Sequence, residues 1–421
     1  MAANSYFVKH SFYSKQIQDV PDNNLGIVIV IPCYNEPDLI SALEAIWKCE
    51  RPACSVEVIV VVNSSEKEKE EVLNQNALTV KLSSGWIKEH DDPRLKFYII
   101  EASDLPGKHA GVGLTRKIGM DEAALRLDTV LNKNGVIVCF DADCTCDSDY
   151  LIEIENHFKK HLLASGCSIY YEHPISGNRF DKDIYEGILN YELFLRYYNQ
   201  ALRYSGFPFA YHTVGSSMAV RNEAYQKQGG MNKRKAGEDF YFLQKIIPSG
   251  NYTELNTTRV IPSPRSSNRV PFGTGTAIQK WLDNKNKEFI TYHPQTFADL
   301  KGLFLKLPGL YTSISVKPFL DGFSEPVINF LVLNDFEKKI NEIKSNSSSE
   351  AMFRKRFFGW FNSFVALKYV HFVRDNYYPQ MEIGLAAKNL LSMINEVSLK
   401  DLDSNQSLLL KYREIERGIN I

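Results

Sequence analysis

The sequence predicts an α/β fold in which a mainly parallel sheet is flanked by helices, with a helical C-terminal domain. Two observations lead to this fold class. Short runs rich in β-branched residues alternate with segments of helical periodicity, and polar residues follow directly after each run. We expect buried strands at the apolar runs 27–31, 56–62, 96–101 and 136–140. The 421 residues leave room for roughly two or three domains.

The composition excludes several classes of protein. Lys and Arg together number 49 against 50 Asp and Glu, so a large nucleic-acid footprint is not expected. The seven cysteines include no Cys-x-x-Cys pair, which is typical of reduced thiols in a cytoplasmic protein. No signal peptide is expected, and no apolar run approaches the roughly 18 residues that span a bilayer. We therefore expect a cytoplasmic location.

In the first half of the chain, helices are expected between the strands. A polar extension, 1–24, ends in a turn signal, and Pro32 is expected to end the first strand. Leu39, Leu43 and Ile46 recur at helical spacing after it. The expected helices between the strands are 38–48, 66–78 and 114–131.

The second half is less regular. Strands are expected at 166–171 and 215–220, and helices at 184–203 and 237–247. A loop rich in Pro, Arg, Ser and Gly follows at 260–275, and the sequence is mostly helical from 276. The expected domains are the extension 1–24, an α/β domain at 25–275 and a helical domain at 276–421.

Asp141-Ala142-Asp143 is the strongest local motif, because it follows a buried strand directly. In parallel sheets the ligand lies outside the carboxyl ends of the strands. Two carboxylates there suit Mn²⁺ or Mg²⁺, which one or two carboxylates and substrate phosphates usually hold. A surface turn is the alternative for so short a motif.

Charged residues near the same edge have two interpretations each. Glu238-Asp239 opens a helix, where acidic residues favour the helix dipole, or else it supplies a general base. Lys108 and Arg116 belong to a solvated helix face, or they neutralise a diphosphate. Arg265 and Arg269 lie in a second glycine-containing loop that lacks the spacing of a P-loop.

The order of these features resembles glycosyltransferase family 2, which has the GT-A fold. The resemblance covers about residues 25–275 and includes the Asp-x-Asp motif and the Gly-Gly-(apolar) and Glu-Asp signature at 229–231 and 238–239. Residues 27–36 (IVIVIPCYNE) resemble its first strand, 113–119 (GLTRKIG) its Gly-x-x-x-Ala-Arg-Asn-x-Gly pattern, and 215–221 (GSSMAVR) its acceptor-side segment. The resemblance implies an inverting transferase that moves a sugar from a nucleoside-diphosphate sugar to an acceptor hydroxyl.

The resemblance also implies roles for single residues. Asp143 would bind Mn²⁺ or Mg²⁺ together with Asp141, which would also lie near the ribose. The catalytic pair would be Glu238 and Asp239, with Asp239 as the base. The remaining donor-binding residues would be Pro32, Tyr34 and Glu36 in the nucleotide pocket, Asn63 near the nucleobase, and Arg116, Lys108, Arg265 and Arg269 near the diphosphate.

Two departures from the family bear on function. The second strand ends in Asn63-Ser64-Ser65 where the family usually has an Asp that reads the nucleobase, so the base stays open. No Gln-x-x-Arg-Trp follows Asp239, which excludes the processive, membrane-embedded polymer synthases. The acceptor, a glycan, lipid or protein, is not specified.

Other interpretations stay open. The aromatic and basic stretch 351–373 is either a core-packing helix or an interfacial helix that makes peripheral membrane contact. The chain is alternatively a degenerate nucleotide-sugar-binding scaffold without turnover, or a sugar nucleotidyltransferase. The latter is expected to carry a Gly-rich basic loop after the first strand, where this chain has Cys33-Tyr34-Asn35-Glu36.

Overall fold

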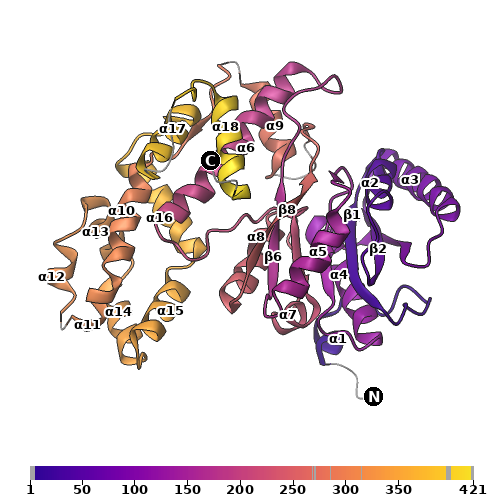
Figure 1. Ribbon diagram of the computed structural model, residues 1–421, viewed down its shortest axis with the longest axis horizontal. Coiled ribbons are helices and arrows are strands. Elements are labelled where there is room, and N and C mark those ends of the chain that lie inside the picture. The colour runs from indigo at the N-terminus through magenta and orange to yellow at the C-terminus, as the bar shows by residue number, and fades with distance from the viewer. Residues whose placement is uncertain are drawn as a thin grey trace. The chain divides into compact units, whose positions relative to one another are not determined.

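The computed structural model describes residues 5–267, 269, 272–284, 286–313, 315–394 and 400–418. The chain divides into two compact units (Figure 1). The first comprises Met1–Tyr185 and His212–Gln279, and the second Glu186–Tyr211 and Lys280–Ile421. Residues 186–211, which the sequence analysis keeps with the α/β domain, thus group with the helical unit. The proposed domain boundaries stay a prediction.

Within the described part of the first unit, eight strands form one sheet in the order β3-β2-β1-β4-β7-β6-β8-β5. Strands β1 to β4 run parallel to one another, while β7 is antiparallel to both β4 and β6. The bounds are β1 Leu25–Cys33, β2 Ser55–Ser65, β3 Leu95–Leu105, β4 Val136–Cys139, β5 Thr145–Cys146, β6 Gly166–Tyr171, β7 Met218–Arg221 and β8 Thr253–Ile261. This confirms the predicted fold class, a mainly parallel sheet flanked by helices together with a helical C-terminal region.

Two strands differ from the expectation. Pro32 does not end β1, because the parallel pairing with β2 continues through Pro32 and Cys33 opposite Val61 and Val62. Proline removes only a hydrogen-bond donor, which the end of a strand tolerates. The sequence analysis missed β8, whose residues (TELNTTRVI) are mostly polar and lack the continuous apolar run of β1.

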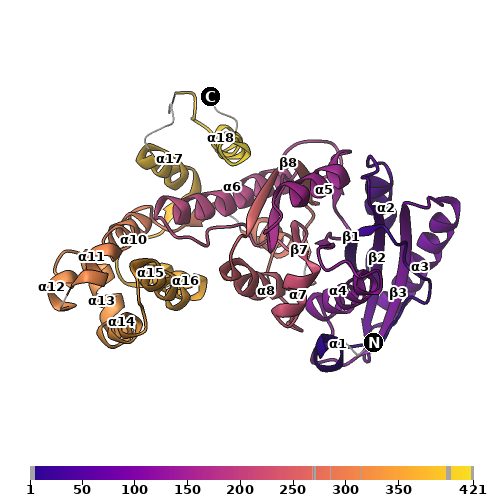
Figure 2. The same ribbon diagram turned by 60° about the horizontal axis from the view of Figure 1, so that its bottom comes forward.

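Helices of the first unit cover the sheet, and α4 (Val112–Thr129) is the most deeply buried of those described. A Cβ added at Gly119 would lie 2.4 Å from Val30 Cγ1, so α4 packs directly on β1. Figure 2 shows α4 beside the strands β1 and β2. The other bounds are α1 Ser5–His10, α2 Leu39–Trp47, α3 Glu70–Glu89, α5 Tyr150–Lys160, α7 Asn222–Lys227 and α8 Glu238–Ile246.

The described part of the predicted extension 1–24 packs on α4. The hydroxyl of Tyr6 donates to Asp121 Oδ1 at 2.6 Å, and the backbone N–H of Ile17 donates to Glu122 Oε1 at 3.1 Å. Both acceptors are buried carboxylates of α4. The extension therefore satisfies charges on the helix that carries Arg116.

The described part of the second unit is helical apart from the short pair β9 (Ile290–Thr291) and β10 (Met381–Glu382). Its helices are α10 Gln295–Leu305, α11 Leu307–Thr312, α12 Lys317–Leu320, α13 Glu325–Leu333, α14 Phe336–Ser345, α15 Glu350–Trp360, α16 Ser363–Asn376, α17 Ile383–Ile394 and α18 Asn405–Arg417. Helices α6 (Lys182–Tyr204) and α9 (Thr274–Asp283) have residues in both units.

The aromatic residues of the stretch 351–373 lie in the core of the second unit. Phe353, Phe357, Phe358 and Phe361 are buried. The core-packing interpretation expects this, and the basic residues 354–356 of the same helix are exposed. No helix within the described ranges is long and apolar enough to cross a membrane.

Candidate functional site

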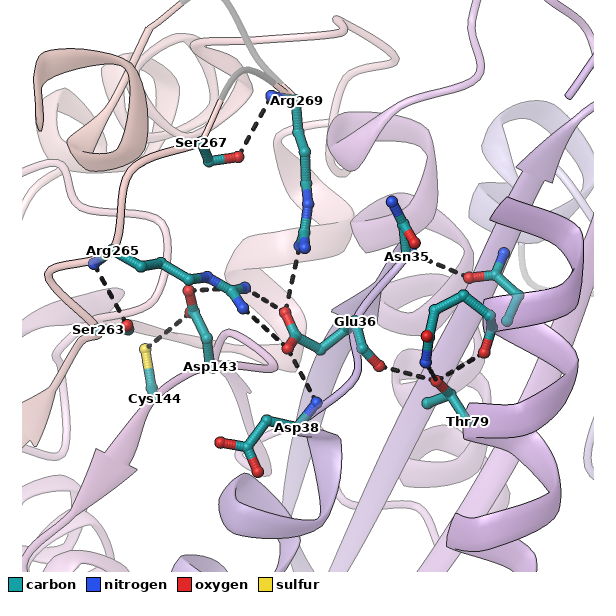
Figure 3. A network of polar contacts seen from close by, with 12 residues as sticks. Asn35, Glu36, Asp38, Thr79, Asp143, Cys144, Ser263, Arg265, Ser267 and Arg269 are labelled. Carbon is teal, nitrogen blue, oxygen red and sulfur yellow. Dashed lines mark hydrogen bonds and ion pairs between the residues drawn. The ribbon is translucent and has the colours of Figure 1, made fainter. Parts of the chain in front are cut away.

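The turn after β1 is held by side chains from α3. The backbone N–H of Asn35, which adopts φ +49°, donates to Asn76 Oδ1 at 2.9 Å. Asn76 Nδ2 donates to the backbone carbonyl of Asn63 at 2.9 Å. Thr79 Oγ1 donates to the backbone carbonyl of Glu36 at 2.8 Å (Figure 3). Helix α3 therefore fixes the carboxyl ends of β1 and β2 relative to each other and orients Glu36.

Glu36 is a buried carboxylate bound by two arginines. Arg265 donates to it from both Nη atoms, one of them at 2.9 Å, and Arg269 Nη1 lies 3.2 Å from Glu36 Oε2. The backbone N–H of Asp38 adds a bond of 3.1 Å. Burial alone would raise the pKa of Glu36, but the two guanidinium groups and this N–H outweigh it and lower the pKa. Glu36 is therefore an anion that anchors the loop around Arg265.

Arg265 also reaches the Asp-x-Asp motif. Its Nη2 lies 3.0 Å from Asp143 Oδ2, so one guanidinium spans Asp143 and Glu36 (Figure 3). The Asp143 side chain is 27% exposed. Burial, together with the charges of Asp141 and Glu36, raises the pKa of Asp143 to about 6, although Arg265 acts in the opposite direction.

Arg116 links the motif to the start of α8. Its Nη2 donates to Asp141 Oδ1 and its Nη1 to Glu238 Oε1. The Arg116 side chain is only 3% exposed, and its Nε has no hydrogen-bond partner in the described part of the chain. A Cβ added at Gly215 would lie 2.5 Å from Arg116 Nη1, so the guanidinium packs against that glycine.

The two acidic residues that open α8 are in different environments. Glu238 is buried against Arg116, whereas Asp239 is half-buried and accepts from the backbone N–H of Phe240, at 2.7 Å. Burial and the charge of Asp239 raise the pKa of Glu238 to about 7 against the opposing effect of Arg116. Burial likewise raises the pKa of Asp239. Among the described residues, Asp239 forms no ion pair, so its carboxylate is not committed to a cation.

Carboxylates outnumber arginines in this region. The five carboxylates are Glu36, Asp141, Asp143, Glu238 and Asp239, and the three guanidinium groups are those of Arg116, Arg265 and Arg269. When all are ionised, the acidic excess is two charges. A hard divalent cation fits such a set of oxygen atoms. The described residues contain no group of three His, Cys, Asp or Glu in reach of one ion. A metal here would therefore need further ligands from water or a diphosphate.

Comparison with known protein families identifies part of this region. Residues 136–283 match the model of the family described as Glycosyl transferase family group 2. The match begins at β4 and includes the Asp-x-Asp motif, the start of α8 and the loop around Arg265.

Comparison with solved structures finds chains of S. aureus TarS. TarS 1-349 in complex with UDP-GlcNAc is 13% identical, with a TM-score of 0.40, and the alignment covers 94% of this chain and 92% of the TarS 1-349 chain. TarS 1-349 without a named ligand is 12% identical, with a TM-score of 0.39, over 80% of this chain and 92% of the TarS 1-349 chain. No curated protein matches the chain.

The structure brings together seven of the residues proposed from the glycosyltransferase resemblance, namely Glu36, Arg116, Asp141, Asp143, Glu238, Arg265 and Arg269. Asp239 adjoins them in sequence. Residues 268, 270 and 271 of the predicted loop lie outside the described residues.

The four other proposed residues take no part in the described ion pairs of the site. The hydroxyl of Tyr34 donates to Glu68 Oε1 at 3.1 Å, and Asn63 is buried in β2. Pro32 is half-buried in β1, and Lys108 is exposed in the turn before α4. Their assignment to a donor pocket stays a prediction.

Sequence reasoning missed the residues that position the site. Asn76 and Thr79 were not singled out, and Thr79 falls beyond the predicted helix 66–78, because α3 extends from Glu70 to Glu89. A signal exists in retrospect. Asn76, Thr79 and Ser83 form a buried polar stripe at helical spacing, where an ordinary surface helix buries apolar residues.

Proposed function

We propose that this protein is an inverting, divalent-metal-dependent glycosyltransferase. It would move a sugar from a nucleoside-diphosphate sugar to the hydroxyl of an acceptor. The family match over residues 136–283 supports sugar transfer. The donor class, the inversion and the metal are our extension of it.

One observation carries the proposal. Two arginine-centred bridges join the Asp-x-Asp motif to the elements on either side, through Arg265 to Glu36 and through Arg116 to Glu238. They leave an acidic excess and one half-buried carboxylate, Asp239, without an ion pair among the described residues. A purely structural network would balance its charges, because buried charge without a counter-ion is costly. The excess suits a site completed by a cation and its ligand.

The donor would bind at Asp143 with the metal. Asp143 and Asp141 supply the hard oxygen ligands, and the donor's diphosphate would supply the rest. When bound, the metal contributes Lewis acidity that stabilises the leaving nucleoside diphosphate. Arg265 must release or share Asp143 Oδ2, and its guanidinium, with that of Arg269, is then suited to a phosphate oxygen.

Asp239 would act as the general base. It accepts the proton of the acceptor hydroxyl while the acceptor oxygen forms a bond to the anomeric carbon. The bond from that carbon to the diphosphate oxygen breaks on the opposite face, so the configuration inverts. Arg116 holds Glu238 and Asp141 in place, and it is a positioning residue because its guanidinium is buried between them.

The proposal is tested first with a thermal-shift panel of UDP, GDP, CDP and TDP and their sugars, each with and without Mn²⁺. A ligand at 100 times its Kd stabilises the folded state by about 2.7 kcal/mol. We expect one nucleotide to give a Mn²⁺-dependent shift, which then defines the donor for transfer assays. The absence of any shift favours the scaffold without turnover. Release of pyrophosphate from a nucleoside triphosphate and a sugar 1-phosphate would instead identify a nucleotidyltransferase.

A further inference from the structure

A basic segment stands directly before the proposed base. Residues 233–235 are Lys-Arg-Lys, and all three are exposed. The segment has a defined conformation, because Asn232 Nδ2 donates to the backbone carbonyl of Glu238 at 2.7 Å. Asp239 follows Lys235 by four residues, so this segment borders the place where an acceptor hydroxyl must arrive.

Two glycines of the α4 N-terminus fix the segment in space. A Cβ added at Gly113 would lie 2.1 Å from the carbonyl oxygen of Arg234, and one at Gly111 would lie 3.2 Å from Lys235 Cα. The exposed Lys108 precedes this end of α4 by four residues. One turn into the same helix, Arg116 binds Glu238 and Asp141. The basic segment therefore lies at the rim of the candidate site, and Lys108 stands in the turn that leads into this end of α4.

These four cations have no carboxylate partners. Lys108, Lys233, Arg234 and Lys235 form no ion pair within the described part of the chain. Aromatic rings hold two of them instead. Arg234 lies over the ring of Tyr241 at 3.6 Å, and Lys233 over the ring of Phe12 at 4.7 Å. A ring orients a cation without neutralising it. The charge of the four groups thus remains available, in a chain whose net charge is -1.

The proposed donor does not account for this positive surface. Arg265 and Arg269 lie beside the Asp-x-Asp motif and are placed for the diphosphate. The basic segment lies instead beside α8, the helix of the proposed base. A phosphate group matches it, because guanidinium and ammonium groups form charge-assisted hydrogen bonds to phosphate oxygens.

We infer that the acceptor carries a phosphate group, which Lys233, Arg234, Lys235 and Lys108 bind while a hydroxyl of the same molecule faces Asp239. The inference rests on the proposed glycosyltransferase function and narrows its acceptor class. A bare membrane surface fits less well, because the segment 232–236 (NKRKA) offers no large apolar side chain for insertion.

The test compares three full-length proteins by calorimetric titration with glycerol 3-phosphate and with glycerol. The first is the wild type, and the second carries K233Q, R234Q and K235Q. The matched control carries R354Q, K355Q and R356Q, which removes three consecutive exposed cations of α15, one of them also over an aromatic ring. We expect saturable binding of glycerol 3-phosphate, but not of glycerol, to the wild type and the control. Because at least two charge-assisted bonds are lost, the affinity of the first triple variant should fall about tenfold or more.

Donor binding separates the inference from the function on which it rests. The Mn²⁺-dependent thermal shift with the donor nucleotide should be equal in all three proteins. If the wild type shows no such shift, the proposed function fails. If the shifts are equal but the first triple variant binds glycerol 3-phosphate as tightly as the wild type, the acceptor inference alone is overturned. The charge reversal K235E, which adds a repulsive carboxylate at one exposed position, must weaken binding in the same direction.

A vesicle arm distinguishes a phosphate ester from a lipid surface. The three proteins are sedimented with phosphatidylglycerol and with phosphatidylcholine vesicles. Sedimentation with phosphatidylglycerol that requires residues 233–235, without saturable binding of glycerol 3-phosphate, would replace the acceptor site by a membrane-contact site and overturn the inference. Competition of glycerol 3-phosphate against any such sedimentation supports it.

Discussion

Each of the two units contains a network of arginine–carboxylate ion pairs, and the two networks differ in charge balance and in exposure. In the second unit, Arg196 and Arg413 both bind Glu192, and Arg196 also binds Glu416. These three bridges join two cations to two carboxylates, and none of these side chains is more than 10% exposed. In the first unit, five carboxylates face three arginines, and the side chains of Asp141 and Asp143 are 35% and 27% exposed.

The difference shows how to distinguish a structural network from a binding site. A buried network must satisfy its own charges, because charges taken from water without partners are costly. The network around Glu192 does so and fixes α18 to α6 within the second unit. The network around the Asp-x-Asp motif leaves acidic charge uncompensated and partly accessible. Single substitutions should therefore affect stability in one network and ligand binding or turnover in the other.

The largest effect is expected for Asp239→Asn. If Asp239 is the base, its loss should lower the transfer rate by about 10²- to 10⁴-fold, the usual contribution of a general base. Donor binding should persist, because Asp239 lies outside the arginine bridges. The measurement is the steady-state rate alongside the donor thermal shift. Transfer at the wild-type rate would disprove the assignment.

Glu192→Gln should produce the opposite pattern. Removing one partner from a buried ion pair typically costs about 3–5 kcal/mol, because the remaining charge is left uncompensated. We expect a lower urea midpoint and an unchanged Mn²⁺-dependent donor shift. The exposed pair of Lys388 and Asp403 is the matched control, since Asp403→Asn should cost less than about 1 kcal/mol. Equal losses in the two variants would contradict the comparison.

The acidic excess also predicts how stability changes with pH. The pKa of Glu238 is raised to about 7 in the folded state by burial and by Asp239, so the folded protein retains a proton that the unfolded chain releases near its ordinary value of 4.5. This contribution is fully present below pH 4.5 and is lost as the pH rises towards 7. We expect a loss on the order of 2 kcal/mol across that window. Urea unfolding of the wild type and Glu238→Gln, at pH 5 and at pH 7.5, measures it. A profile as steep in the variant as in the wild type would contradict the assignment.

Most of the fold and part of the candidate site could be predicted from the sequence. The buried runs of β1, β2 and β4 gave the parallel sheet, because continuous β-branched residues have few other solutions. The strand ends then located Glu36, Asp141 and Asp143 at one edge. That Glu238 and Arg265 lie at this same edge was predicted only from the family resemblance. No local sequence pattern indicates that the start of α8 and the loop around Arg265 lie near the end of β4, which is far from both along the chain.

The sequence did not predict which charged side chains pair with each other. Arg116 was assigned to the diphosphate, but its burial between Asp141 and Glu238 depends on the close approach of Gly215. For the network around Glu192, the sequence shows only the i,i+4 pair of Glu192 and Arg196, because Arg413 and Glu416 lie more than two hundred residues further along the chain. Long-range pairing of this kind follows from packing and not from local periodicity.

Asp143→Ala removes one carboxylate from the network in which carboxylates outnumber arginines. Without metal, Arg265 keeps its bonds to Glu36, so the free energy of unfolding should hold or rise, in contrast to Glu192→Gln. With Mn²⁺, the donor affinity should fall by about tenfold or more, equivalent to at least about 1.4 kcal/mol, if Asp143 is the proposed carboxylate ligand of the metal. Donor titrations with Mn²⁺ and with a chelator, beside urea unfolding of the same protein, separate the two effects. A variant that is strongly destabilised without metal, yet binds the donor as the wild type does, would place Asp143 with Glu192 among the structural charges. The reverse result would assign the acidic excess to the ligand.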